Sequence, residues 1–224
     1  MKYTIIGQTV PAVECELMAG ESMFTQSGGM IWQTEGITMS TNARGGIARS
    51  LGRIFTGESV FMANYTAETD GARIAFGSTV PGTVVPVDVS FTDIICQKGS
   101  FLCAEQSVDL QVAFTKRFTT GLFGGEGFIL QRIFGKGMVF LEVDGDMVER
   151  NLSAGEVLKV DTGNVVAFDT SVRYEIETVK GLGNVFFGGE GLFLTRLTGP
   201  GRVILQTQNF NDFAGRIISR VPTK

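Results

Sequence analysis

The stretch that decides the fold is Phe123-Gly124-Gly125-Glu126-Gly127, because it recurs 64 residues later as Phe187-Gly188-Gly189-Glu190-Gly191. The segment upstream repeats at the same offset, with Ser107-Val108 matched by Ser171-Val172. Self-similarity at a fixed period indicates a repeated structural unit. The match continues downstream through Leu130/Leu194, Arg132/Arg196, Gly135/Gly199, Gly137/Gly201, Val139/Val203 and Leu141/Leu205.

An earlier and weaker copy of this pattern occupies residues 55–62, with the sequence FTGESVFM. Its Gly57 and Glu58 correspond to the glycine and glutamate of the later copies, and Gly71 stands where Gly137 stands in the second. Each copy follows a β segment and a glycine-containing connection. The sequence therefore predicts three tandem units with boundaries near residues 80 and 150, namely 1–80, 81–150 and 151–224.

Most of the chain consists of short runs rich in β-branched and aromatic residues, separated by turn residues such as those of 144–146 (DGD) and 161–164 (DTGN). Several runs alternate apolar and polar residues, as half-buried strands do. This pattern predicts an all-β fold. The clearest strand candidates are residues 30–34, 83–87, 108–112, 138–143, 173–177 and 202–206.

Two short segments instead repeat their apolar residues every three or four positions, which is typical of an amphipathic helix. Helices this short gain their stability mainly from packing, so both are expected to cover a sheet. The first begins near Ile47 and carries the basic residues Arg44, Arg49 and Arg53. The second ends the chain with the apolar residues Phe210, Phe213, Ile217 and Val221, among which lie Arg216 and Arg220.

The composition excludes several classes of function. None of the 224 residues is a histidine, so Ser-His-Asp and Cys-His catalysis, imidazole metal sites and histidine pH switches are excluded. The three cysteines, Cys15, Cys96 and Cys103, fit no CxxC spacing and are expected to be small buried hydrophobes. A hydrophobic content of 43% with 18 phenylalanines is ample for a core.

The first residues and the net charge favour a cytoplasmic protein. Residues 1–10 lack the apolar core of a secretion signal, and no apolar run approaches the ~20 residues that cross a bilayer. The formal net charge of -4 favours solubility and argues against a generally basic surface. Nucleic acid is therefore not an expected partner.

The motifs together resemble a known family. Residues 81–88 (PGTVVPVD), 97–102 (QKGSFL) and 199–201 (GPG), together with the two FGGEG stretches, are similar to the family named for altered inheritance of mitochondria. The resemblance covers nearly the whole chain and implies a fold like that of the tryptophan RNA-binding attenuation protein. It implies three tandem β-sandwich or double-stranded β-helix units with short connecting helices, associated into rings. Fungal relatives are linked to mitochondrial membrane organisation, whereas this chain lacks a transit segment and resembles a bacterial cytosolic member.

The repeated glycines and glutamates are the candidate sites for chemistry. A phosphate loop needs a strand that leads into a helix, with Lys and Ser or Thr at fixed spacing, and neither Gly-Gly-Glu-Gly stretch has these. The glutamates would bind a cation if they converged, but each is expected to cap its turn or pair with an arginine such as Arg132 or Arg196. Asp88 and Asp161 are likewise expected in turns. The predicted turn residues are Gly57, Glu58, Gly124, Gly125, Glu126, Gly127, Gly188, Gly189, Glu190 and Gly191.

These observations predict a non-enzymatic scaffold or binding protein without a catalytic residue, metal, cofactor or identifiable small-molecule ligand. The best candidate contact surface is the basic set Arg44, Arg49 and Arg53, facing acidic lipid headgroups or nucleic-acid phosphate. A peripheral protein of anionic membranes and, by fold analogy, an RNA-binding protein remain the alternatives. Three β units leave an unpaired edge at each end, so we expect a closed homo-oligomer, a trimer with nine units.

Overall fold

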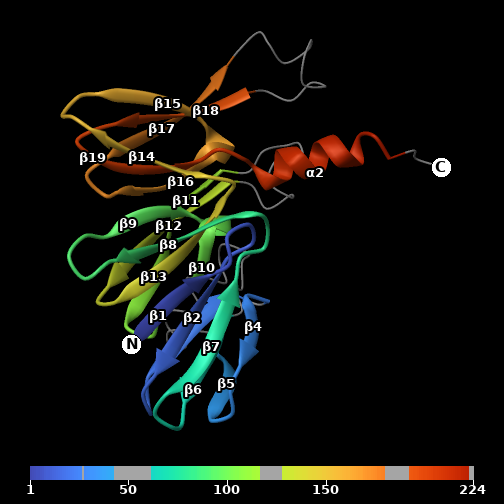
Figure 1. Cartoon of the computed structure of the whole chain (residues 1–224). Helices are drawn as coiled ribbons and strands as arrows, with labels where there is room; N and C mark the ends of the chain where they lie inside the picture. The colour runs from blue at the N-terminus through green and yellow to red at the C-terminus, as the bar shows by residue number, and fades with distance from the viewer. Residues whose placement is uncertain (27, 43–61, 117–127, 180–191, 222–224) are drawn as a thin grey trace. The chain divides into compact units, whose positions relative to one another are not determined.

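The computed structural model describes residues 1–26, 28–42, 62–116, 128–179 and 192–221 (Figure 1). In these ranges the chain forms β-strands joined by turns, with one α-helix, so the all-β prediction is confirmed. All six strand candidates lie in strands. The chain divides into two compact units: unit 1 holds residues 1–88, 101–109 and 135–142, and unit 2 holds 89–100, 110–134 and 143–224.

Unit 1 is a sandwich of two sheets. Sheet A has the strand order β1-β2-β7-β4: β1 (Lys2–Ile6), β2 (Ala12–Leu17), β7 (Ala72–Gly77) and β4 (Met30–Gln33). Sheet B has the order β5-β6-β3-β10-β13-β8: β5 (Ile37–Asn42), β6 (Met62–Ala67), β3 (Ser22–Gln26), β10 (Phe101–Glu105), β13 (Met138–Asp144) and β8 (Gly82–Asp88).

The core of unit 1 is built by the alternate residues of these strands that point to one face. Tyr65 of β6 meets Phe76 of β7 edge to face, with ring centroids 5.9 Å apart. Burying one such large side chain stabilises the fold by roughly 1.5 to 3 kcal/mol. The same cluster includes Val13, Cys15, Leu17, Met23, Ile74, Leu102, Cys103 and Phe140.

Unit 2 is also a sandwich. Sheet C has the order β11-β12-β9-β16-β19-β14: β11 (Val108–Lys116), β12 (Phe128–Gly135), β9 (Ile94–Gln97), β16 (Val165–Asp169), β19 (Gly201–Gln206) and β14 (Met147–Leu152). Sheet D has the order β15-β18-β17: β15 (Val157–Asp161), β18 (Leu192–Thr198) and β17 (Arg173–Val179). Its core includes Phe128, Leu130, Phe168, Leu197 and Val203, with Tyr174 packed against them.

The sheets are assembled from two kinds of three-stranded group, each of which occurs three times. The β7-type triplets are β2-β7-β4, β8-β13-β10 and β14-β19-β16. The β6-type triplets are β3-β6-β5, β9-β12-β11 and β15-β18-β17. In chain order, strands β2 to β7, β8 to β13 and β14 to β19 each supply one triplet of either kind.

The β7-type triplets share a detail that makes the correspondence specific. The register shifts between Met30 and Trp32 where β4 pairs with β7, between Phe101 and Cys103 in β10, and between Val165 and Ala167 in β16. A bulge of this kind leaves one residue out of the ladder and re-aims its neighbours. The bulged residues are Ile31, Leu102 and Val166.

A side-chain hydrogen bond recurs at the same place. The Thr34 hydroxyl accepts from the backbone N–H of Arg73 at 2.9 Å, and the Asp169 carboxylate accepts from that of Arg202 at 2.9 Å. The Glu105 carboxylate accepts from the Met138 N–H at 2.6 Å in the third instance. The bulge and this bond together align β4, β10 and β16 residue by residue.

The predicted boundary near residue 80 falls between β7 and β8, and the one near 150 falls inside β14. The compact units follow a different division, because β10 and β13 of the second strand set belong to sheet B of unit 1 while β9 and β12 of that set belong to sheet C of unit 2. The division into three sequence units stays a prediction, since compactness measures spatial contact rather than repetition.

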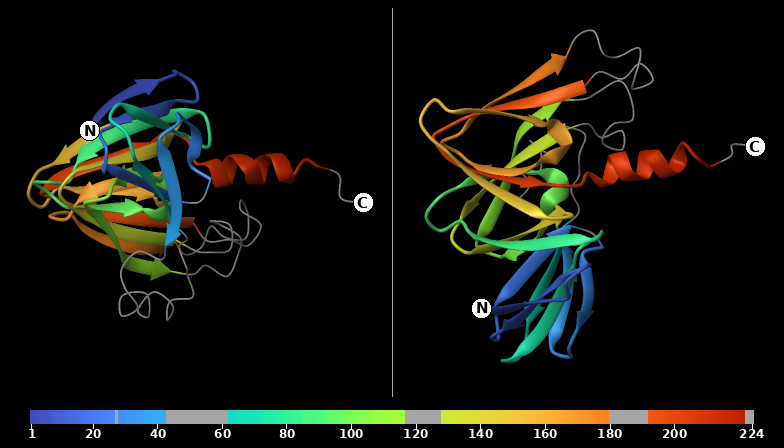
Figure 2. Two further views of the ribbon diagram at one scale, coloured as in Figure 1. Left: turned by 90° about the horizontal axis from the view of Figure 1, so that it is seen from below. Right: turned by 45° about the horizontal axis from the view of Figure 1, so that its top comes forward.

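The second predicted helix is α2 (Phe210–Ile218). Its N-cap is Asn209, whose side-chain oxygen accepts from the N–H of Asn211 at 3.0 Å. The expectation that it covers a sheet is wrong, because none of its residues is buried. Figure 2 shows it leading away from the strands of its own unit. The helix predicted near Ile47 lies outside the described residues.

Candidate functional site

The candidate site residues named from the sequence lie outside the described residues. This holds for the basic set Arg44, Arg49 and Arg53 and for all ten turn residues, Gly57, Glu58, Gly124, Gly125, Glu126, Gly127, Gly188, Gly189, Glu190 and Gly191.

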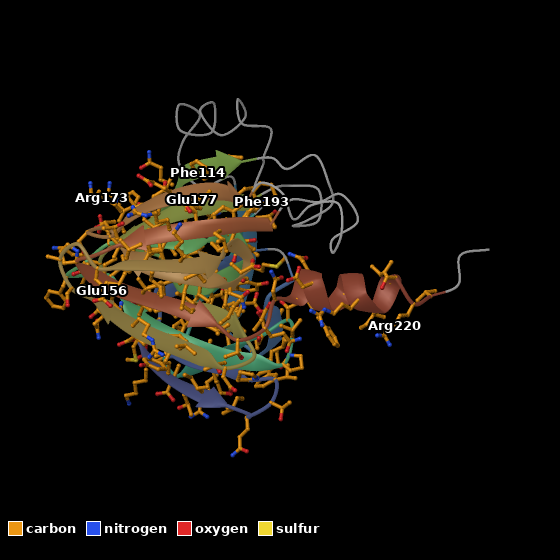
Figure 3. All side chains as sticks on the ribbon, turned by 90° about the horizontal axis from the view of Figure 1, so that it is seen from above. Phe114, Glu156, Arg173, Glu177, Phe193 and Arg220 are labelled. Atoms are coloured by element: carbon orange, nitrogen blue, oxygen red, sulfur yellow. The ribbon has the colours of Figure 1, made fainter. Side chains whose placement is uncertain are left out.

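The two arginines expected to pair with these glutamates have carboxylate partners in the described ranges. The Arg132 Nε donates to Asp93 at 3.0 Å, in the loop before β9. Arg196 lies on β18 between Glu175 and Glu177 of β17, at 3.7 and 3.9 Å. Glu177 also accepts from Lys159 of β15 at 2.7 Å, and it is labelled in Figure 3. These half-exposed ion pairs lie on sheet C at Arg132 and on sheet D at Arg196 and Lys159, and surface pairs of this kind contribute little to stability.

The cysteines are core residues. Cys15, Cys96 and Cys103 are free and buried, as predicted. Burial, with a smaller effect of the Glu105 charge, raises the pKa of Cys15 to about 12. Burial also raises the pKa of Cys96 and of Cys103. Among the described residues there is no group of three or more Cys, Asp or Glu that could hold a metal ion.

Asp161 was expected in a turn, and it is the last residue of β15, directly before a short 3-10 helix. It caps the short 3-10 helix Thr162–Asn164, and its carboxylate accepts from the N–H of Gly163 at 3.0 Å. Asp88 is the last residue of β8.

Two strand edges have unusual properties, and they are the first candidate site. The strands β4 and β15 lie at the edges of sheets A and D, whereas their counterparts lie inside six-stranded sheets. The difference is visible in burial: Ile31 and Trp32 of β4 are 48% and 43% exposed, while all matching residues in β10 and β16 are at most 3% exposed. Those matching residues are Leu102, Cys103, Val166 and Ala167.

The edge strand β15 differs from its counterparts in the same way. Its central residue Lys159 is exposed, and Leu158 and Val160 on either side are only half-buried. In β3 and β9, by contrast, the matching central residues are buried, namely Met23, Phe24 and Thr25, and Ile94, Ile95 and Cys96. An exposed strand edge carries unpaired N–H and C=O groups and is a template for pairing with another strand.

The second candidate site is the helix α2. Its start is held by the Asp144 carboxylate, which accepts from the backbone N–H of Phe210 at 2.8 Å. Burial raises the pKa of Asp144, and this hydrogen bond opposes the rise. Beyond that anchor the apolar side chains are between 44% and 69% exposed, and Figure 3 shows Arg220 beyond the end of the helix. The exposed apolar residues are Phe210, Phe213, Ile217, Ile218 and Val221.

Sequence reasoning missed β4 and β15 as a site. The signal that could have found them is a difference between aligned units: Lys159 stands at the place of Ile95, and Trp32-Gln33 at the place of Ala167-Phe168. A polar residue where the other copies are apolar marks a position that the single chain leaves in water.

The fold and these sites define a class: an all-β protein of antiparallel sheets, with open sheet edges and an exposed amphipathic helix. In the described ranges no helix is long and apolar enough to span a bilayer. The chain belongs to the mitochondrial biogenesis AIM24 family, whose model matches residues 3–208. The resemblance seen in the motifs is thereby confirmed.

Two similar proteins come from Streptococcus pyogenes. One is an uncharacterized protein of a serotype M6 strain, 28% identical over 232 residues, which cover 100% of this chain and 92% of the relative. The other is known from a crystal structure, with a TM-score of 0.79 and 25% identity, covering 98% of this chain and 99% of that one. Neither description states a function.

Proposed function

We propose that the protein is a non-enzymatic scaffold that assembles with copies of itself, head to tail, into a closed ring in the cytoplasm. The observation that carries this proposal is the pair of open edges at β4 and β15, whose counterparts are paired and buried within the chain. A head-to-tail contact between two different surfaces forms a ring when the rotation closes.

The scaffold consists of three tandem units of the attenuation-protein-like kind, with one β7-type and one β6-type triplet each. The common bulge in β4, β10 and β16 supports this interpretation. The recurring hydrogen bond from Thr34, Glu105 and Asp169 to the facing strand supports it as well. A ring of three chains holds nine units.

The mass in solution tests the assembly. Light scattering coupled to gel filtration should give about 72 kDa, three times the chain mass of 24.1 kDa. A monomer that persists at micromolar concentration refutes the ring, whereas a dimer or hexamer changes only the number of chains. Turnover in an unbiased hydrolase and transferase screen, lost in Glu126→Gln or Glu190→Gln, would replace the scaffold with an enzyme.

A second candidate function is contact with an anionic membrane surface, and α2 favours it. A helix with an exposed apolar face and flanking basic residues lies in the membrane interface, and anionic lipids strengthen its binding. Here Phe213 and Ile217 are 48% and 51% exposed, with Arg216 and Arg220 beside them.

Vesicle flotation tests this second function. The wild type should float with phosphatidylglycerol vesicles and much less with pure phosphatidylcholine. The double variant Phe213→Asp, Ile217→Asp should lose flotation if α2 is the contact. If a triple variant with Arg44, Arg49 and Arg53 changed to Glu loses flotation instead, the basic segment makes the contact. If the wild type does not float, this second function is eliminated.

A further inference from the structure

The chain contains two internal junctions between triplets, and they follow one rule. In sheet B, β3 pairs antiparallel with β10, and in sheet C, β9 pairs antiparallel with β16. Each junction joins a β6-type triplet to the β7-type triplet that follows next along the chain. Among the described strands, no triplet follows the third β6-type triplet, sheet D, and none precedes the first β7-type triplet, in sheet A.

Both junctions use the same register. At the β9–β16 junction, Cys96 pairs with Ala167, Ile95 with Phe168 and Ile94 with Asp169. At the β3–β10 junction the pairs are Thr25 with Cys103, Phe24 with Ala104 and Met23 with Glu105.

The position of β15 in this register follows from its own sheet. Ile95 of β9 pairs with Arg132 of β12, and Lys159 of β15 pairs with Arg196 of β18, 64 residues further on in both strands. The neighbouring pairs keep the same offset. Lys159 therefore occupies the place of Ile95.

The position of β4 follows from the bulge. Trp32 is the first paired residue after the bulge in β4, as Ala167 is in β16. Gln33 then takes the place of Phe168, and Thr34 that of Asp169, in agreement with the hydrogen bonds that Thr34 and Asp169 accept from the facing strand.

We propose that β15 of one copy pairs antiparallel with β4 of a second copy, with Val160 opposite Trp32, Lys159 opposite Gln33 and Leu158 opposite Thr34. This inference rests on the proposed assembly and names its joint. The joint completes sheet D in the way that sheets B and C are completed inside the chain.

The strand that pairs with β15 comes from a second copy of the chain, because β15 matches β4 and does not match another β15. In both internal junctions a β6-type strand meets a β7-type strand, never one of its own kind. Pairing of β15 with β15 would place two Lys159 side chains close together, and like charges across strands destabilise a pair. Opposite Gln33, Lys159 meets a neutral side chain and keeps its ion pair with Glu177 at 2.7 Å.

Disulfide trapping tests the joint. Residues directly opposite in an antiparallel pair have Cα atoms about 4.5 to 5.5 Å apart, which a disulfide spans. The double variant Gln33→Cys, Lys159→Cys should form reducible covalent oligomers under mild oxidation. The introduced cysteines form these cross-links, because the three native thiols are buried. Gln33→Cys with Val157→Cys is the off-register control, and each single variant tests pairing between like edges.

The outcomes separate the joint from the assembly. Oligomers trapped by the matched pair, and far less by the control, support the inference. An intact oligomer that is trapped only by the control, by a single variant or by none overturns the joint and leaves the scaffold. A disulfide that forms within a monomer shows that the two strands do not come from different copies, and it overturns the inference. If the reduced protein is a monomer in solution, the proposed function itself is refuted.

Charge at the same position gives an independent readout without covalent trapping. Gln33→Lys places like charges opposite each other, and Gln33→Glu places opposite charges there. The dissociation constant per joint should rise about two- to five-fold in the first variant and fall about two- to five-fold in the second. Equal effects of the two variants overturn the register.

Discussion

The native thiols should react slowly with a disulfide reagent, and the size of this effect follows from their burial and pKa. The disulfide-trapping experiment depends on it, because the native thiols must not form the cross-links. Cys15 lies in the core cluster of unit 1 and is 0% exposed. Its pKa is raised to about 12, mainly because burial disfavours the thiolate. The nucleophile towards a disulfide reagent is the thiolate, whose ordinary pKa is about 8.5. The experiment treats the native protein with such a reagent at pH 8.

At pH 8 an ordinary thiol is about one quarter ionised, whereas a thiol with a pKa of about 12 is ionised to about one part in 10,000. Ionisation alone therefore slows the reaction of Cys15 by about three orders of magnitude. Cys96 and Cys103 are also 0% exposed, and burial raises the pKa of each, so their reaction is slow as well.

The assay is the release of a coloured thiolate from an aromatic disulfide, followed at pH 8 with and without guanidinium chloride. The folded protein should release almost none within the time in which the unfolded chain releases three equivalents. Ser219→Cys adds an exposed thiol after α2 and serves as the positive control for the folded state. Prompt release of one or more equivalents from the folded wild type would show that at least one native thiol is accessible.

Three further predictions concern stability, measured by denaturant titration. Phe168→Ala should cost about 3 to 5 kcal/mol because Phe168 is 1% exposed, whereas Phe91→Ala, at 90% exposure, should stay within about 0.5 kcal/mol; equal losses would contradict the core assignment. Gly201→Val should destabilise by about 1 to 3 kcal/mol, because its φ is +143° and an added Cβ would lie 2.6 Å from a serine hydroxyl, whereas Gly215→Ala in α2 should be neutral or stabilising by up to about 1 kcal/mol. The Met18 N–H donates to the Glu21 carboxylate and lowers the pKa of that carboxyl below its usual 4.5. The ionised Glu21 therefore stabilises the fold above pH 4.5, and this stabilisation is lost as the pH falls through the folded-state pKa. Glu21→Gln should flatten this acid dependence by less than about 1 kcal/mol, and an unchanged pH profile would exclude the link.

Local patterns in the sequence predicted the strands, because period-two alternation is a property of consecutive residues. The six predicted strand runs lie in β4, β8, β11, β13, β17 and β19. The C-terminal helix was predicted from the spacing of Phe210, Phe213 and Ile217, and the buried cysteines from their unsuitable spacing for metal or redox chemistry. The offset of 64 residues also reappears in the pairing of β9 with β12 and of β15 with β18.

The sequence predicted an unpaired edge at each end of the chain but not which strands form these edges, because that depends on contacts between residues far apart in sequence. Whether a strand edge is covered depends on a partner strand far away in sequence. Cys103 of β10 is buried beside Thr25 of β3, whereas Trp32, at the matching place in β4, has no such neighbour in the described part of the chain and is 43% exposed. The start of α2 also involves a residue far away in sequence, because the Asp144 carboxylate accepts from the N–H of Phe210.

The all-β class, the repetition and the absence of histidine chemistry follow from the composition and from neighbours along the chain, so they can be read without a structure. Only the tertiary structure decided how the triplets combine into sheets and which edges stay open. A backbone N–H or C=O in a strand needs a partner, and within the described residues a second neighbouring strand supplies partners at β10 and β16 but not at β4. An alternating pattern specifies which face of a strand is buried, and the fold specifies which of its edges is paired.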